Sequence, residues 1–168
     1  AELKRRLQKQ IKSKTKQIEE AAFKAISVIV DAVDSKGKYN RGHFVRVAKC
    51  AGWISRKLGW SEKDVSNMYY VALLHDIGNI YVSDDTIGKP SKLTEEEFEE
   101  IKTHPFFGSE ILKNVTSIKD VVNGAMYHHE RYDGHGYNYG LKGEEIPIVA
   151  RIIHVADAYD AMTGGRIY

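Results

Sequence analysis

Histidine and aspartate side chains that could bind a metal ion occur at five separate places in this chain. The candidates include one His-Asp pair and one His-His pair, and the full set is His43, His75, Asp76, His104, His128, His129 and Asp157. Five imidazoles and two carboxylates without a thiolate suit borderline divalent ions such as iron, manganese, nickel or zinc better than magnesium or calcium. The residue types therefore predict a transition-metal site and leave these four metals open.

The adjacent pair His75-Asp76 indicates two metal ions rather than one. Neighbouring residues on a helix point ~100° apart, so in regular helical geometry they do not readily chelate the same ion. They can serve two ions side by side if the Asp76 carboxylate bridges them. His75 and its neighbours would then complete one ion and the pair His128-His129 the other.

Helical patterns cover most of the chain and must position these residues. Apolar residues recur at spacings of three, four or seven, and three segments beginning at Ser61, Thr94 and Ser117 have the form of a capping box. No run shows sustained alternation of period two, so the predicted fold class is all-α. We expect helices over residues 1–34, 43–58, 61–78, 94–104, 106–114, 117–129 and 146–163, and a functional loop over 129–146.

The first 34 residues are predicted to form one long helix ahead of a single domain over 35–168. Its first half is basic and is expected to project, whereas its second half is apolar and is expected to join the core. A solvated helix face is the simplest explanation of the basic run. A coiled-coil lead from an upstream sensor domain, a homodimer through this helix and a site for an acidic partner are the alternatives.

Composition excludes several classes of protein. The 168 residues are 42% hydrophobic and 29% charged, with a net charge of +2, so nothing favours a nucleic-acid polymer or an anionic membrane as partner. No apolar run has the ~18 residues of a membrane span. The single cysteine, Cys50, favours a reducing compartment, so we expect a cytoplasmic protein.

An ordered series of motifs resembles the HD domain superfamily, and within it the HD-GYP cyclic di-GMP phosphodiesterases. The match runs from about Gly37 to Tyr168 and rests on GHFVRVA, LLHDIGN, IGKPSKLTEEEFEEIKTHPFFGSEIL, YHHERYDGHGYNYGLKGEEIP and ARIIHVADAYDAMTGGRIY. The resemblance implies an HD-domain helical bundle around two metal ions. It places His43, His75 and Asp157 on one ion, His104, His128 and His129 on the other, and Asp76 as the bridge.

The resemblance also implies hydrolysis of cyclic di-GMP to pGpG and onward to GMP, with His75 and Asp76 as catalytic residues. Two ions ~3.5–4 Å apart would lower the pKa of a bridging water and direct the hydroxide at phosphorus. Cationic and aromatic side chains suit a phosphodiester and a guanine base. The expected substrate-binding residues are Asn79, Arg131, Tyr137 and Arg166.

Departures from the HD-GYP pattern leave two other functions open. Asn79 stands where HDIGK carries a lysine, and Asn138 replaces the proline of GYP. Tyr39 stands where a glutamate would add a third metal, so two metals are expected. Similar proteins continue past GGRIY with a lysine and further helices, so the domain is expected to be truncated at its C-terminus. The alternatives are a degenerate sensor with little turnover, and another HD-type activity such as a different nucleotide phosphohydrolase or a di-iron oxygenase.

Overall fold

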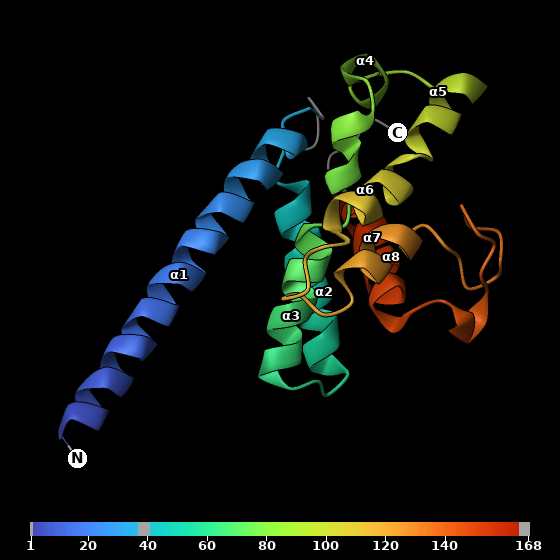
Figure 1. Cartoon of the computed structure of the whole chain (residues 1–168). Helices are drawn as coiled ribbons and strands as arrows, with labels where there is room; N and C mark the ends of the chain where they lie inside the picture. Colours follow the sequence, from blue (N-terminus) through green and yellow to red (C-terminus); the bar gives the residue numbers. More distant parts are fainter. Residues whose placement is uncertain (1, 37–40, 165–168) are drawn as a thin grey trace.

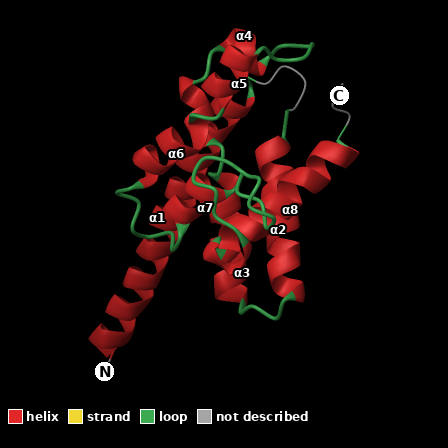
Figure 2. Ribbon diagram, turned by 90° about the vertical axis from the view of Figure 1, so that its right-hand side faces the viewer, coloured by secondary structure: helices red, strands yellow, loops and turns green. Residues whose placement is uncertain are grey.

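The computed structural model describes residues 2–36 and 41–164, and in this part of the chain all regular structure is helical. The predicted all-α class is therefore confirmed. A long helix extends away from a bundle of shorter helices (Figure 1), and loops connect the helices without any strand in the described part (Figure 2). The elements are α1 (Glu2–Asp34), α2 (His43–Lys57), α3 (Glu62–Leu73), η1 (Ile77–Tyr81), α4 (Asp84–Ile87), α5 (Glu95–Ile101), α6 (His104–Leu112), α7 (Val121–Tyr127), η2 (Gly143–Glu145) and α8 (Ile148–Thr163), where η denotes a 3₁₀ helix.

The core lies where α2, α3, α7 and α8 pack together. Small and branched apolar side chains face one another there, among them Ala48, Met68, Ala72, Ala125 and Ile153, all of which are fully buried. The close approach of α7 to α3 requires a glycine, because a Cβ on Gly124 would lie 2.4 Å from a methyl carbon of Val71. Burial of these faces stabilises the bundle and fixes the helix ends that carry the histidines.

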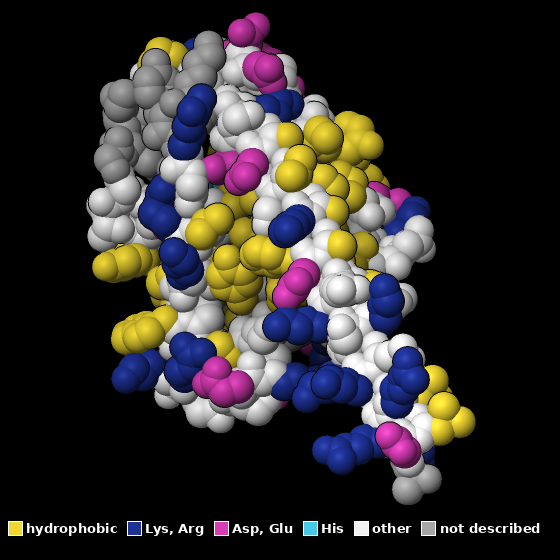
Figure 3. All heavy atoms as spheres, turned by 90° about the vertical axis from the view of Figure 1, so that its left-hand side faces the viewer, with side chains coloured by type: hydrophobic (Ala, Val, Ile, Leu, Met, Phe, Trp, Pro, Cys, Tyr) yellow, Lys and Arg dark blue, Asp and Glu magenta, His cyan; other side chains and the backbone are white. Residues whose placement is uncertain are grey.

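Helix α1 contributes little to this core. Val30 and Val33 are buried, whereas Leu3, Leu7 and Ile11 in its first half are more than half exposed. Lys and Arg side chains gather along its projecting part (Figure 3). The second half was expected to join the core, and it does so through one face, while Val28 and Ile29 on the rest of its surface remain exposed.

A capping residue marks the start of a helix at two of the three places predicted from the sequence. Ser61 accepts a hydrogen bond from the Asp64 amide, and Thr94 and Glu97 form a complete capping box. The start predicted at Ser117 is wrong, since α7 begins at Val121. Asp120 adopts a left-handed backbone with φ 62°, which interrupts the helix, and the Asn67 side chain binds the amide and carbonyl of Lys119.

The segment after α3 also differs from the prediction. Residues 61–78 were expected to form one helix, but α3 ends at Leu73, and η1 and the short helix α4 follow. The Nδ1 atom of the buried His75 ring donates a hydrogen bond to the Ala72 carbonyl at 2.7 Å. This side-chain hydrogen bond competes with continuation of the helix. Ser83 caps α4 by accepting a hydrogen bond from the Thr86 amide. His75 and Asp76 therefore lie in a turn rather than inside a helix.

Candidate metal centre

All seven predicted metal-binding residues come together, six of them at or just beyond the ends of helices and one, Asp157, within a helix. His43 begins α2, His104 begins α6, and Asp157 lies inside α8. The two adjacent pairs lie directly after α3 and α7, beyond the helix ends. The ligand atoms fall into two groups, each with all its atoms within 4.8 Å of one another: Asp76, His104, His128 and His129 in the first group, and His43, His75 and Asp157 in the second.

The Asp76 carboxylate lies between the two groups and presents one oxygen to each. Its Oδ1 atom is 3.0 Å from His104 Nε2 and 3.2 Å from His128 Nε2. Its Oδ2 atom is 3.5 Å from His75 Nε2 and 3.9 Å from His43 Nε2. Within the second group, His43 Nε2 lies 3.3 Å from Asp157 Oδ1. This placement suits a carboxylate shared by two cations.

Backbone carbonyls fix the orientation of three of the rings. His75 Nδ1 lies 2.7 Å from the Ala72 oxygen, and His104 Nδ1 lies 2.7 Å from the Ile101 oxygen. His128 Nδ1 lies 2.9 Å from the Ala125 oxygen. Because a carbonyl only accepts hydrogen bonds, each Nδ1 carries the proton, and each Nε2 lone pair faces the site in the neutral ring.

His43 is oriented by a carboxylate instead of a carbonyl. Its Nδ1 atom lies 2.8 Å from Asp160 Oδ2, and Arg46 Nε donates to Asp160 Oδ1 at 2.6 Å. Asp160 is buried, so its charge depends on these two partners. Neither Arg46 nor Asp160 was predicted from the sequence to belong to the site. The feature of the sequence that could have indicated them is helical spacing, because Arg46 follows His43 by three residues and Asp160 follows Asp157 by three.

The donor set fits divalent cations. His75 Nε2 is buried and has no hydrogen-bond partner among the described residues. His104 Nε2 and His128 Nε2 lie 3.1 Å apart, so two lone pairs face each other when both rings are neutral. A cation that accepts both lone pairs removes this repulsion. The site is thus arranged to coordinate metal ions through Nε2 atoms.

Burial keeps the imidazoles of His75 and His129 uncharged. Desolvation lowers the pKa of His75 to about 4, although the nearby Asp76 carboxylate opposes the shift. Desolvation also lowers the pKa of His129 well below its usual value, and His128 adds to the effect. Neutral rings at physiological pH are the form that binds metals.

The structure brings Tyr137 to this centre. Its ring stacks on His129 with the centroids 4.6 Å apart, and the Tyr137 amide donates to the His129 carbonyl at 3.2 Å. Desolvation raises the pKa of the Tyr137 hydroxyl, so this side chain stays protonated. The loop over 129–146 therefore folds back onto the first group of ligands.

The other predicted substrate residues have different surroundings. The Arg131 guanidinium forms a two-pronged ion pair with Asp133, at 3.0 and 2.5 Å, so its charge is engaged within the loop. Asn79 lies in η1, and its carbonyl accepts a hydrogen bond from Lys36. Arg166 and Tyr39 lie outside the described residues.

Two further residues that the sequence analysis left out support the His128-His129 segment. His154 Nδ1 donates to the His128 carbonyl at 2.9 Å from α8. Glu130 is 1% exposed, and its Oε1 atom accepts from the Tyr139 amide at 2.7 Å. Both contacts hold the loop against the helix ends. The available signal in the sequence for Glu130 was its position directly after two candidate ligands.

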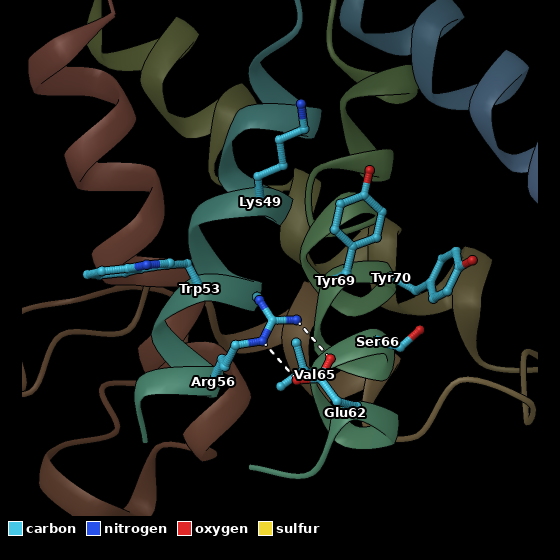
Figure 4. A pocket seen from close by; sticks show the side chains of 9 residues that line it. Lys49, Trp53, Arg56, Glu62, Val65, Ser66, Tyr69 and Tyr70 are labelled. Atoms are coloured by element: carbon cyan, nitrogen blue, oxygen red, sulfur yellow. Dashed lines mark hydrogen bonds and ion pairs between the residues drawn. The ribbon is translucent and has the colours of Figure 1, made fainter. Parts of the chain in front are cut away.

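A groove of about 300 Å³ lies between α2 and α3 and contains none of the candidate ligands. Lys49, Trp53, Tyr69 and Tyr70 line it (Figure 4). Arg56 and Glu62 pair across its lower end at 2.9 Å. Trp53 is 58% exposed and belongs to this surface rather than to the core.

Comparison with known proteins agrees with this geometry. The family model described as HD domain matches residues 12–168. The chain belongs to the HD domain family. Membership of this family implies divalent metal ions, and the resemblance to HD-GYP proteins expected from the motifs is confirmed by the relatives.

Two curated relatives are similar over most of this HD domain. The cyclic di-GMP phosphodiesterase response regulator RpfG of Xanthomonas campestris pv. campestris is 37% identical over 164 residues, which are 96% of this chain and 43% of the relative. The 3'3'-cGAMP-specific phosphodiesterase 3 of Vibrio cholerae is 40% identical over 136 residues, or 81% of this chain and 30% of that protein. The chain thus spans less than half the length of these relatives.

A solved structure shares the fold. Bd1817, a HDG"Y"P protein from Bdellovibrio bacteriovorus, superposes with a TM-score of 0.63 over 73% of this chain and 40% of that chain, at 24% identity.

In the described part of this HD domain, no helix has the length and apolar character needed to cross a membrane.

Proposed function

We propose that this HD domain hydrolyses a phosphodiester bond of a cyclic dinucleotide. The observation that carries the proposal is the position of Asp76 between two histidine-rich groups, with one carboxylate oxygen toward each. Two adjoining sites that share a carboxylate are typical of two-metal phosphoester hydrolysis. Similarity to two cyclic-dinucleotide phosphodiesterases supports the same reaction class.

Two divalent ions are the proposed cofactors, with iron or manganese favoured and nickel or zinc as alternatives. The first would bind to His104, His128 and His129, the second to His43, His75 and Asp157, and Asp76 would bridge them. Bound ions would supply Lewis-acid activation of water and of the phosphate. The chain's own part is to hold neutral imidazoles in fixed directions through Ala72, Ile101, Ala125 and Asp160.

Cyclic di-GMP is the proposed substrate, opened to linear pGpG and onward to GMP. Similarity to a 3'3'-cGAMP-specific enzyme makes that dinucleotide the second candidate. Tyr137 would offer an aromatic face beside the metal groups, since it already stacks on His129. Asn79 supplies no cation where HDIGK has a lysine, so we expect attenuated turnover. Arg131 and Arg166 remain proposed substrate contacts.

The N-terminal helix is the proposed connection to an upstream sensor domain and the proposed surface of a homodimer. Leu3, Leu7, Ile11 and Ile18 are exposed along it at spacings that suit helix pairing. The domain boundary at residues 34 and 35 and the cytoplasmic location stay predictions.

The test is a chromatographic assay of the purified chain loaded anaerobically with ferrous iron or manganese. Cyclic di-GMP and 3'3'-cGAMP are incubated separately, and linear dinucleotide and mononucleotide products are followed over time. Formation of pGpG supports the proposal, and faster cleavage of the mixed dinucleotide would change the assigned substrate. No product from a chain that carries two metals per molecule would favour the sensor or another nucleotide.

A further inference from the structure

Lys36 lies two residues after the end of α1, and its side chain reaches the end of η1. Its ammonium lies 2.7 Å from the Val82 carbonyl, 3.1 Å from that of Ile80 and 3.2 Å from that of Asn79. The carbonyls at the C-terminal end of a helix carry partial negative charge and favour a cation there. Lys36 therefore joins the end of α1 to a segment 43 to 46 residues further along the chain.

The backbone contacts matter more than the ion pair that Lys36 also makes. Asp84 Oδ1 lies 3.2 Å from the same ammonium, but the Asp84 side chain is 74% exposed, so solvent screens this pair. The Lys36 side chain is only 19% exposed. Three carbonyls in a fixed arrangement thus define the position of the ammonium.

The η1 segment contacts Lys36 and also two of the candidate ligands. Asp76 is the residue at its N-terminal cap. Within η1, Gly78 packs directly on the backbone of α6, where an added Cβ would lie 1.9 Å from the His104 oxygen and 2.6 Å from the Gly108 nitrogen. A displacement of η1 therefore moves Asp76 and presses on His104, both of which belong to the first group.

We propose that Lys36 is a positioning residue for the first metal group. It fixes η1 against α6 and thereby sets the place of Asp76 relative to His104 across their 3.0 Å contact. This inference rests on the proposed ligands, but not on the identity of the substrate. It links the long helix α1 to the metal centre through one side chain.

The test compares Lys36→Met with Lys24→Met, since Lys24 is an exposed lysine within α1. Methionine keeps an unbranched apolar chain and removes the ammonium. A third variant, Val65→Ala, weakens the core of α3 and serves as a control for general loss of stability. Manganese affinity is measured by titration calorimetry, and amide hydrogen exchange is measured on the metal-free chain.

For Lys36→Met we expect manganese affinity to fall by about tenfold, as for other residues that orient ligands. Exchange should become faster over residues 77–82 and 104–108 than elsewhere. Lys24→Met should match the unchanged chain, and Val65→Ala should not single out these two segments. Wild-type manganese affinity in Lys36→Met would overturn the inference, whatever the exchange rates.

These readouts separate the inference from the proposed function. A chain that binds manganese but hydrolyses neither dinucleotide refutes the proposed activity, while the affinity comparison still decides the role of Lys36. If the unchanged chain binds no manganese, the ligand assignment fails. In that case, unchanged exchange over residues 104–108 in Lys36→Met would also overturn the inference.

Discussion

His104 and His128 face each other through their Nε2 atoms at a distance of 3.1 Å. Both Nδ1 atoms donate to backbone carbonyls, of Ile101 and Ala125 respectively, so neither ring can turn without losing a hydrogen bond. When both rings are neutral, their Nε2 lone pairs repel each other. A cation that both lone pairs coordinate would remove this repulsion. Metal binding and folding stability are therefore coupled in this HD domain.

Removal of metal should lower the thermal stability. A ligand at 100 times its Kd stabilises the folded chain by ~2.7 kcal/mol, which corresponds to about 5–10 °C in a domain of this size. The check is calorimetric melting with a chelator, followed by dialysis and addition of manganese. Equal melting temperatures in the presence and absence of metal would contradict this coupling.

Replacing the shared carboxylate should affect both metal positions. In Asp76→Ala, bound metal should fall from two ions per chain to one or none, and hydrolysis should fall by about 100-fold or more. Elemental analysis gives the stoichiometry and the chromatographic assay gives the rate. Asp31→Ala, which removes an exposed carboxylate of α1, is the matched control. Retention of two ions by Asp76→Ala would refute the bridging assignment.

Asp160 should act through His43. Loss of its carboxylate in Asp160→Ala leaves the His43 Nδ1 and the Arg46 guanidinium without this partner. We expect affinity at one of the two metal positions to fall by about 10- to 100-fold. Asp160→Asn keeps one oxygen acceptor and should have a smaller effect. Titrations of both variants with manganese check whether Asp160→Ala loses more affinity than Asp160→Asn. An equal loss of affinity at both metal positions would speak against an action through His43.

The metal-free chain should lose stability as the pH falls from about 6.5 to about 4. Burial lowers the pKa of His75 to about 4 in the folded chain, from 6.5 as the ordinary value, so the unfolded chain binds more protons in this range. Stability then rises with pH, and one such group contributes about 3 kcal/mol above pH 6.5. Urea unfolding at several pH values is the measurement. His75→Gln should show a shallower pH dependence, and an identical slope would contradict this origin.

Gly78 should tolerate no side chain. A Cβ at this position would overlap the His104 oxygen at 1.9 Å, so Gly78→Ala must displace η1 from α6. We expect a loss of about 2–3 kcal/mol in unfolding free energy together with weaker metal binding. Gly52→Ala is the matched control, because its Cβ would meet only a methyl carbon of Val65 at 3.9 Å. Equal stability of the two variants would show that η1 and α6 do not pack as described.

The helical nature of the chain and the identity of the candidate ligands could be predicted because both depend on residue type and local spacing. Capping residues Ser61 and Thr94 marked real helix starts. Ser117 did not, because Asp120 and the contact of Asn67 with Lys119 impose a different backbone there. Local patterns fail where a distant side chain supplies the competing hydrogen bonds.

The sequence by itself determined the all-α class, the long first helix and a histidine-rich, thiolate-free donor set, since these follow from composition and periodicity. Only the tertiary structure decided how these donors are arranged. It placed Asp76 between two groups, oriented His43 through Asp160, and engaged Arg131 with Asp133. The physical reason is that distances between residues far apart in the chain are set by helix packing, which burial of the shared core fixes.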